Sequence, residues 1–142
     1  MRKLIVEHLY YEKEEKTCCR CRDSSIAVKN AIRQMESSLK SINVAIELKT
    51  TLLGEDQINM SNAIKINGEN ILDILGEKQP LMTLCPSCTE LIGKDTTCQT
   101  FTYKGNYYDS VSEQMLAEAI LKEASTFIDM GRMGPRKCIC GI

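Results

Sequence analysis

The sequence predicts a single α/β domain built on a central mixed sheet of about four to five strands. Three observations lead to this fold class. A strand-like segment at residues 3–11 is followed by a helical pattern and by a second strand-like segment from Val44. Further along, a hairpin pattern over residues 98–110 precedes a last helical pattern. The length of 142 residues suits one domain, because a chain of this size buries a substantial core without staples.

The first half of the chain predicts a parallel β-α-β unit. Residues 3–11 (KLIVEHLYY) and 44–52 (VAIELKTTL) are rich in β-branched residues, as strands are. Residues 23–25 (DSS) offer helix N-cap side chains, and a helix ending near Ser41 follows. Two strands joined by such a helix are parallel with a right-handed crossover. The helix has one apolar face, formed by Ala31, Ile32, Met35, Leu39 and Ile42.

The middle of the chain predicts a third strand and then an insertion. Residues 63–68 (AIKING) form the strand, which Asn67-Gly68 closes as a turn. Residues 69–76 (ENILDILG) are typical of one short helical turn that ends at a glycine. No clear period follows until residue 97, so we interpret residues 69–97 as a cysteine-bearing insertion.

The last third predicts a hairpin, a helix and a tail. Residues 98–110 turn around Lys104-Gly105-Asn106. Ser110 and Ser112 are equally good caps for the final helix. Its apolar face is made by Met115, Leu116, Ala119, Ile120, Ala124 and Phe127. Glycine, proline and basic residues then predict a flexible tail at residues 129–142, so the domain is expected to span residues 1–128.

Charge and hydropathy exclude several classes of partner. The formal net charge is −1, so no general field attracts nucleic acid. No apolar run approaches the roughly 18 residues of a membrane span. The N-terminal segment has no small-residue cleavage site, so we expect a first strand there, not a signal peptide, and a cytoplasmic protein.

Eight cysteines in a cytoplasmic protein indicate metal binding or catalysis, because structural disulfides are rare in that compartment. In the first cluster, Cys18 and Cys21 form a C-x-x-C pair near a helix start with Lys16, Arg20 and Arg22 close in sequence. Helix N-termini and cations stabilise thiolates. This predicts a redox dithiol, with Cys18 near the exposed loop as attacking thiolate and Cys21 as resolving thiol. A disulfide of a partner protein or a small thiol would be the substrate.

Cys19, between the two members of that pair, is interpreted as an unconstrained neighbour.

The second cluster, LCPSCTELIGKDTTC, resembles a zinc knuckle. Cys85, Cys88 and Cys98 offer three soft ligands, and a tetrahedral site needs four. The fourth ligand could come from the first cluster, or both C-x-x-C pairs could form one four-cysteine site. Alternatively, Cys85 and Cys88 are a second redox pair or free thiols. The cofactor is therefore either none or zinc.

Three further residues carry weaker signals. Cys138 and Cys140 form a C-x-C pair in the tail, which suits monovalent copper or a metalloid, a relay dithiol, or simply exposed thiols. His8, the single histidine, is expected to be a packed residue of its strand.

The first part of the chain resembles the opening of thioredoxins, which consists of a strand, a loop, C-x-x-C at a helix start and a parallel strand. The segment IKINGENILDIL resembles the third-strand turn of glutaredoxin-like proteins. Over residues 3–128 the chain resembles a small prokaryotic thioredoxin-like, cysteine-rich family of unassigned function. The motifs that carry this resemblance are TCCRC, SNAIKINGENILDIL, CPSC, Cys98 and YKGNYY. The resemblance implies a thioredoxin-like fold and no particular substrate.

The chain departs from working thioredoxins at one position. They carry a cis-proline before the third strand, where this chain has Ser61, Asn62 and Ala63. We expect Ser61 and Asn62 to face the substrate or a bound group.

Three functions remain open from the sequence. The first is thiol/disulfide redox chemistry at Cys18 and Cys21, which would make the protein a thiol-disulfide oxidoreductase. The second is non-catalytic binding of zinc or a soft metal or metalloid through Cys85, Cys88 and Cys98. The third is a docking module whose cysteines staple the insertion.

Overall fold

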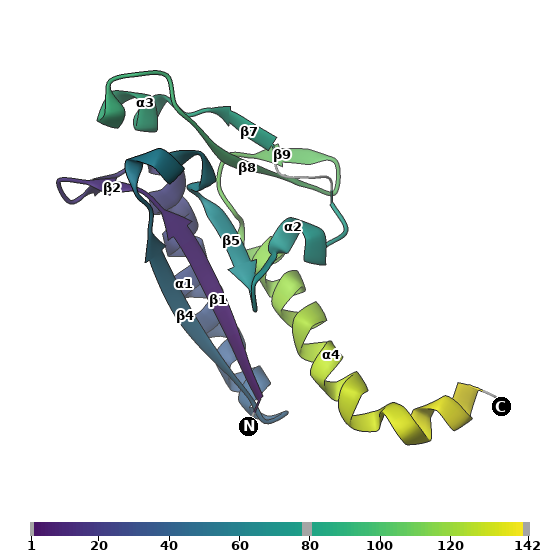
Figure 1. Cartoon of the computed structure of the whole chain (residues 1–142). Helices are drawn as coiled ribbons and strands as arrows, with labels where there is room; N and C mark the ends of the chain where they lie inside the picture. The colour runs from purple at the N-terminus through teal and green to yellow at the C-terminus, as the bar shows by residue number, and fades with distance from the viewer. Residues whose placement is uncertain (1, 78–80, 141–142) are drawn as a thin grey trace.

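A four-stranded mixed sheet with strand order β4-β1-β5-β6 forms the centre of the computed structural model (Figure 1). Its strands are β1 (Arg2–Tyr10), β4 (Val44–Leu52), β5 (Ala63–Ile66) and β6 (Glu69–Asn70). The structure describes the backbone of residues 2–77 and 81–140, and side chains over residues 2–77 and 82–127. β1 is parallel to β4, and β5 is antiparallel to both β1 and β6. Helix α1 (Cys19–Lys40) connects β1 to β4, so the predicted β-α-β unit is confirmed.

Helix α1 begins earlier than the sequence predicts. Cys18 is its N-cap, and the cap residue at the other end is Ser41, as expected. The predicted caps at residues 23–25 lie inside the helix. Ser24 is fully buried, and its hydroxyl accepts a hydrogen bond from the backbone N–H of Val111 at 3.0 Å. A tertiary contact therefore uses the side chain that the local pattern assigned to capping.

A second, three-stranded sheet with order β7-β8-β9 follows the central one. It consists of β7 (Leu81–Leu84), β8 (Thr97–Tyr103) and β9 (Asn106–Tyr108), with helix α3 (Pro86–Ile92) between β7 and β8. The predicted hairpin at Lys104-Gly105 is confirmed as β8-β9, but its expected place in the central sheet is wrong. β6 already pairs with β5, while β8 uses its remaining edge to pair with β7, from Leu81↔Thr100 to Leu84↔Thr97.

Short elements complete the connections. Asn67 and Gly68 have φ of 51° and 87° and form the predicted turn between β5 and β6. Helix α2 (Ile71–Ile74) is the predicted helical turn, and a 3-10 helix η1 (Glu55–Met60) joins β4 to β5. The segment EKEEK forms the small hairpin of β2 (Glu12–Lys13) and β3 (Lys16–Thr17).

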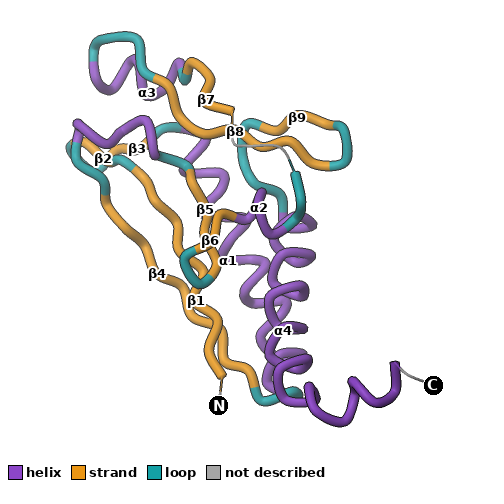
Figure 2. Tube along the Cα trace, turned by 45° about the vertical axis from the view of Figure 1, so that its right-hand side comes forward, coloured by secondary structure: helices purple, strands orange, loops and turns teal. Residues whose placement is uncertain are grey.

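The main core lies between the central sheet and the helices α1, α2 and α4 (Glu113–Cys140). Figures 1 and 2 show α1 and α4 beside each other along the sheet, and the two helices pack together. Ser112, not Ser110, caps α4, since it accepts the N–H of Met115 at 3.1 Å. Largest among the fully buried core side chains are Phe101, Leu4, Leu39, Ile64, Ile66 and Ile71.

Helical backbone in α4 continues through residues 129–140, where the composition predicts a flexible tail. The mobility of this segment stays a prediction, and the side chains of Cys138 and Cys140 lie outside the described ones.

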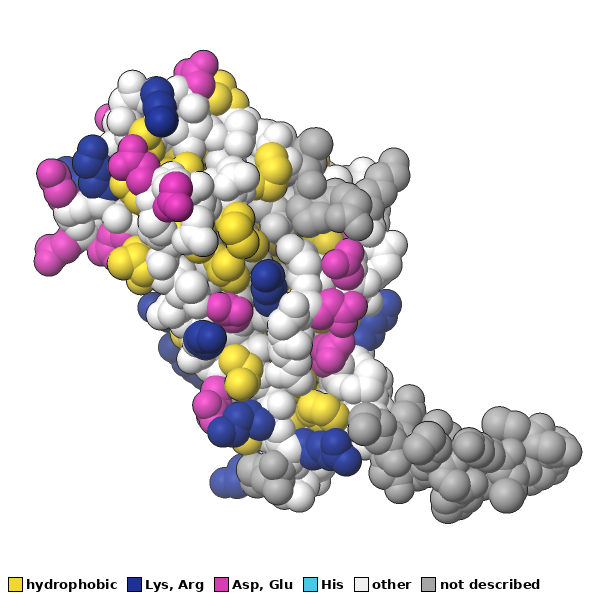
Figure 3. All heavy atoms as spheres, in the orientation of Figure 1, with side chains coloured by type: hydrophobic (Ala, Val, Ile, Leu, Met, Phe, Trp, Pro, Cys, Tyr) yellow, Lys and Arg dark blue, Asp and Glu magenta, His cyan; other side chains and the backbone are white. Residues whose placement is uncertain are grey.

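The opposite face of the central sheet is more open. On it, η1 and a small cluster of Leu9, Leu53 and Ala63 cover part of the surface, while Ile5 and Leu52 are 37% and 59% exposed. Figure 3 shows apolar side chains interspersed with charged ones on this face. None of the helices in the described part of the chain is long and apolar enough to cross a bilayer.

Candidate metal centre

Five cysteines that are far apart in the sequence form one buried cluster. Each is at most 1% exposed, and Tyr10 and Ile58 pack against them. The five are Cys18, Cys21, Cys85, Cys88 and Cys98. They come from the start of α1, the start of α3 and strand β8. The segment between β5 and β8 therefore returns to the first cysteine pair, as a shared site requires.

The two C-x-x-C pairs have the same local construction. Cys18 is the N-cap of α1 and Cys85 is the N-cap of α3, both in extended backbone. Cys21 and Cys88 are the third residues of these helices. Pro86 fits the first position of α3, where the backbone N–H would have no helical partner. In this way two helix N-termini direct their N–H groups towards the cluster, which favours anionic sulfur.

Four of the five sulfurs are mutually close. The Sγ atoms of four buried cysteines all lie within 4.8 Å of one another, and these are Cys18, Cys85, Cys88 and Cys98. In a tetrahedral zinc site with Zn–S bonds of about 2.3 Å, the sulfurs are separated by about 3.8 Å. The observed spread requires only small side-chain movements to reach that geometry. The arrangement therefore suits one tetrahedral ion with four thiolates.

Cys21 lies beside this set without belonging to it. Its backbone N–H donates a hydrogen bond to the Sγ of Cys18 at 3.4 Å. Such a bond offsets part of the negative charge on a thiolate.

The thiols share their protons unequally. Hydrogen bonds from Cys21 first, and then from the other three cysteines, hold the pKa of Cys18 far below its ordinary value. Cys18 raises the pKa of Cys85, but donation from Cys88 and Cys98 outweighs it and lowers that pKa to about 7. Contact with Cys18 raises the pKa of Cys21. In the metal-free cluster, Cys18 is therefore the preferred thiolate.

The same contact with Cys18 raises the pKa values of Cys88 and Cys98. Raised pKa values favour the protonated thiols, and because metal ligation needs thiolates, metal binding to the cluster would release protons.

Arg20 brings a positive charge to the cluster. Its side chain is 10% exposed. The guanidinium donates to the Sγ of Cys98 at 3.4 Å, to Oγ1 of Thr83 at 2.9 Å and to the carbonyl of Leu84 at 2.9 Å. It also lies 3.5 Å from the carboxylate of Asp109. Four thiolates around a divalent ion carry two net negative charges, and Arg20 offsets one of them. The sequence indicated Arg20 only as a nearby cation.

The structure places Cys18 differently from the expectation, and its role as an attacking thiolate stays a prediction. An attacking thiolate near an exposed loop was expected, but Cys18 is 1% exposed. Because Cys18 caps α1, its side chain turns back over the first turn of the helix. Cys19 is the exposed cysteine of this cluster, as expected for an unconstrained neighbour.

Ser61 and Asn62 are fully buried. The backbone carbonyl of Ser61 accepts the N–H of Gln99 at 3.0 Å, and Nδ2 of Asn62 donates to the carbonyl of Gln99 at 2.9 Å. Both residues therefore hold β8 directly beside Cys98. Their proposed orientation towards a substrate stays a prediction.

His8 is 2% exposed and stacks on Tyr10 with ring centroids 5.9 Å apart. Desolvation by burial lowers its pKa to about 4, against a smaller opposing effect of Asn62. The prediction that His8 is a packed residue is confirmed.

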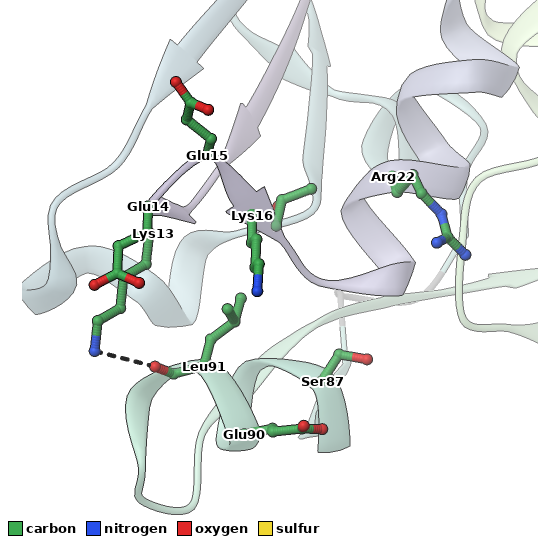
Figure 4. Close-up of a pocket in the computed structure, with 9 residues that line it drawn as sticks. Lys13, Glu14, Glu15, Lys16, Arg22, Ser87, Glu90 and Leu91 are labelled. Atoms are coloured by element: carbon green, nitrogen blue, oxygen red, sulfur yellow. Dashed lines mark hydrogen bonds between the residues drawn. The ribbon is translucent and has the colours of Figure 1, made fainter.

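A cleft of about 700 Å³ adjoins the cluster (Figure 4). It lies between the β2-β3 hairpin, the start of α1 and helix α3. Lys13 spans its edge, donating from Nζ to the carbonyl of Leu91 at 3.2 Å. Three of its lining residues are immediate chain neighbours of buried cysteines, namely Thr17, Arg22 and Ser87.

Comparison with known proteins yields one match. A family model described as "Domain of unknown function (DUF2703)" matches residues 4–120, a range that includes all five buried cysteines. No curated protein and no solved structure matches the chain.

Proposed function

We propose that this chain, which belongs to the DUF2703 family, is a non-catalytic protein that binds one zinc ion through Cys18, Cys85, Cys88 and Cys98. One observation carries the proposal: the Sγ atoms of these four buried cysteines lie within 4.8 Å of one another. Thiolates are the ligands that soft and borderline ions prefer.

The closed nature of the site supports binding over catalysis. All four positions of a tetrahedral ion would be filled by protein sulfur, whereas catalytic zinc keeps one position open for water or substrate. Because the four side chains are at most 1% exposed, a thiolate there has little contact with water. A bound cation removes that cost, since it replaces the missing solvation with direct coordination.

Binding would connect the two sheets. Cys18 caps α1, which packs on the central sheet. The other three ligands lie at the start of α3 and in β8, which are parts of the second sheet and its connection. Helix α3 has only seven residues, and among the described residues neither β7 nor α3 contributes a side chain to the main core, whereas β8 contributes Phe101 and Tyr103. The ion would therefore supply stability that this part of the chain lacks.

We also propose that the central unit is thioredoxin-like and the protein cytoplasmic. The strand order β4-β1-β5-β6, with a parallel first pair and an antiparallel third strand, supports the first point. The position of Cys18, directly before α1 and after strands β1 to β3, also supports a thioredoxin-like unit. A reducing compartment would keep the five buried thiols available for a metal.

A second candidate function is thiol/disulfide exchange at Cys18 and Cys21. The observation that favours this candidate is the strongly lowered pKa of Cys18. Hydrogen bonds from Cys21 and from the other cysteines lower it. Thiolate is the reactive form of cysteine. The full burial of Cys18 opposes this candidate, because a protein disulfide must reach the attacking sulfur.

Elemental analysis of protein purified without chelator tests the proposal. We expect one zinc per chain in the wild type and in Cys19→Ser, and loss of that zinc in Cys98→Ser. Cys19→Ser is the matched control, because Cys19 is exposed and lies outside the four-sulfur set. Cobalt substitution should give the absorption bands of a tetrahedral thiolate site in the wild type and in Cys19→Ser.

Zinc content in Cys98→Ser equal to that of the wild type would overturn the proposal. A metal-free wild type that reduces protein disulfides, with activity lost in Cys18→Ser, would establish the second candidate instead.

A further inference from the structure

We propose that a disulfide between Cys18 and Cys21 forms on oxidation and releases the bound metal, so that metal occupancy reports the redox state of the protein's surroundings. The inference rests on the proposed function, because it assigns a regulation to the same four-thiolate site.

The starting point is that Cys18 belongs to two groups at once. It is one of the four sulfurs within 4.8 Å of one another. It is also the first member of a C-x-x-C pair whose second member, Cys21, is 1% exposed and packs in the same cluster. The N–H of Cys21 lies 3.4 Å from the Sγ of Cys18. A tetrahedral ion has no use for a fifth thiol.

The local geometry suits a disulfide. Cys18 is the N-cap of α1 and Cys21 is three residues further. Residues with this spacing in a helix lie on one face with about 5–6 Å between their Cβ atoms, and a disulfide needs about 3.5–4.5 Å. Closing the disulfide therefore requires only a local adjustment within the first turn of α1.

Cys21 is also the thiol that metal binding leaves free. A disulfide between Cys85 and Cys88 would require two ligands to leave the ion together, although their spacing is the same. A disulfide between Cys18 and Cys21 takes away only one ligand. Thiolates that coordinate a cation are weaker nucleophiles, and among the five buried cysteines Cys21 is the one that the ion does not coordinate, so we place the first step at Cys21.

The oxidation can be balanced with hydrogen peroxide. The thiolate form of Cys21 attacks one oxygen of peroxide, the O–O bond breaks, and the sulfur becomes a sulfenic acid while the other oxygen leaves as hydroxide and takes up a proton to give water. The sulfur of Cys18 then attacks the Cys21 sulfur, the S–O bond breaks, and the hydroxide takes up a proton and leaves as a second water. The two sulfurs lose two electrons in total, and peroxide gains them.

The product is a poorer metal site. A disulfide sulfur is neutral, whereas the ion was held by thiolate. Three thiolates remain, from Cys85, Cys88 and Cys98, and the connection between α1 and the second sheet is lost at the same time. Zinc should therefore dissociate to a competing chelator.

The cleft shown in Figure 4 is lined by chain neighbours of Cys18 and Cys21, not by the cysteines themselves. Thr17 precedes Cys18, Arg22 follows Cys21, and both line the cleft of about 700 Å³. Figure 4 shows Lys16 directed into the space between the β2-β3 hairpin and α3. Peroxide is as small as two waters, so it needs less opening than a protein disulfide.

The test uses the full-length zinc-loaded chain, hydrogen peroxide and a chromophoric chelator that reports free zinc. We expect the wild type to release its zinc as a Cys18–Cys21 disulfide appears in peptide mass spectra, and a thiol reductant to restore binding. Cys21→Ser should bind zinc like the wild type and release it many times more slowly. Cys19→Ser, the exposed neighbour, should behave as the wild type does.

Three outcomes would overturn the inference. These are release from Cys21→Ser at the wild-type rate, a disulfide that joins Cys85 to Cys88 instead, and a zinc-loaded wild type that keeps its metal under peroxide. All three leave the proposed function intact. If the wild type binds no zinc, both proposals fail. Cys21→Ala serves as a second variant if Cys21→Ser does not fold.

Discussion

Nη1 of Arg20 donates a hydrogen bond to the Sγ of Cys98 at 3.4 Å, so a guanidinium from the first turn of α1 lies directly on a sulfur of strand β8. The same guanidinium group reaches β7, through Thr83 and the carbonyl of Leu84. One side chain thus joins the central sheet, the second sheet and the candidate metal centre. Its charge is permanent at any pH at which the protein folds.

Replacing Arg20 by alanine should weaken both the fold and zinc binding. The change removes the part-buried hydrogen bonds to Thr83 and Leu84 and the cation beside the thiolates. We expect a loss of about 2–4 kcal/mol in the free energy of unfolding and a lower affinity for zinc. Arg22→Ala is the matched control, because the side chain of Arg22 is 63% exposed. Urea unfolding and chelator competition measure the two effects; equal results for the two variants would contradict the prediction.

Asn62 is a second position where the structure predicts a specific pattern of variants. It is fully buried with φ of 70°, and Nδ2 donates to the carbonyls of Gln99 at 2.9 Å and Asp109 at 3.0 Å. Proline, with φ near −65°, cannot adopt this backbone. Asn62→Gly keeps the conformation and loses the hydrogen bonds, at a cost of about 1–3 kcal/mol.

Asn62→Ala should be less stable than Asn62→Gly by a further 1 kcal/mol or so, because the left-handed conformation is strained for alanine. Equilibrium unfolding in urea compares the two variants directly. An alanine variant as stable as the glycine variant would show that the strain at this position is absent.

The elements that the sequence predicts well are those that depend on local pattern. The β-α-β unit follows from apolar periodicity, and the turn at Asn67-Gly68 follows from residues that tolerate positive φ. Long-range choices are harder to predict. The start of α1 differs from the prediction because Cys18 caps the helix, while Ser24 accepts a tertiary hydrogen bond from Val111. Strand β7 is not predicted because its four residues acquire strand structure only by pairing with β8.

The candidate site shows the same division. The residue types and both C-x-x-C spacings are enough to indicate a thiol or metal site. The assignment of four ligands and one free thiol depends on how the chain returns from β6 to β8. Spacing alone gives Cys18 and Cys21 equal roles, and only the fold separates Cys18, which joins the four-sulfur set, from Cys21, which does not.

His8 should make the stability of the protein dependent on pH. Burial lowers its pKa from 6.5 to about 4. The unfolded chain therefore binds a proton that the folded chain refuses between these values, and stability falls as the pH falls from 6.5 towards 4. The full effect is about 3 kcal/mol.

His8→Phe retains an aromatic ring for stacking on Tyr10 and removes the titrating group. We expect the stability difference between the wild type and this variant to shift in favour of the variant as the solution becomes acidic. Urea unfolding of both proteins over that pH range measures it, and protonation of the cysteines affects both equally. Parallel stability profiles would show that His8 does not titrate as its burial predicts.

Metal removal should unfold β7 and α3 before the rest of the chain, because these two elements contribute no side chain to the main core among the described residues and the ligands Cys85 and Cys88 hold them to Cys18. Anything that binds only the folded state stabilises it by about 2.7 kcal/mol at a hundredfold excess over its dissociation constant. A chelator should therefore lower the Tm of the wild type. Cys85→Ser and Cys88→Ser should melt at the lowered Tm already, and chelator should not lower it further.

The matched controls for this experiment are Cys138→Ser and Cys140→Ser, which change none of the four proposed ligands. Both should keep the wild-type Tm and its full response to chelator, since every proposed ligand stays in place. Circular dichroism against temperature, with and without chelator, compares all five proteins. If Cys85→Ser still loses stability on chelation, the metal is held elsewhere; if it melts with the wild type, the cluster contributes nothing to folding.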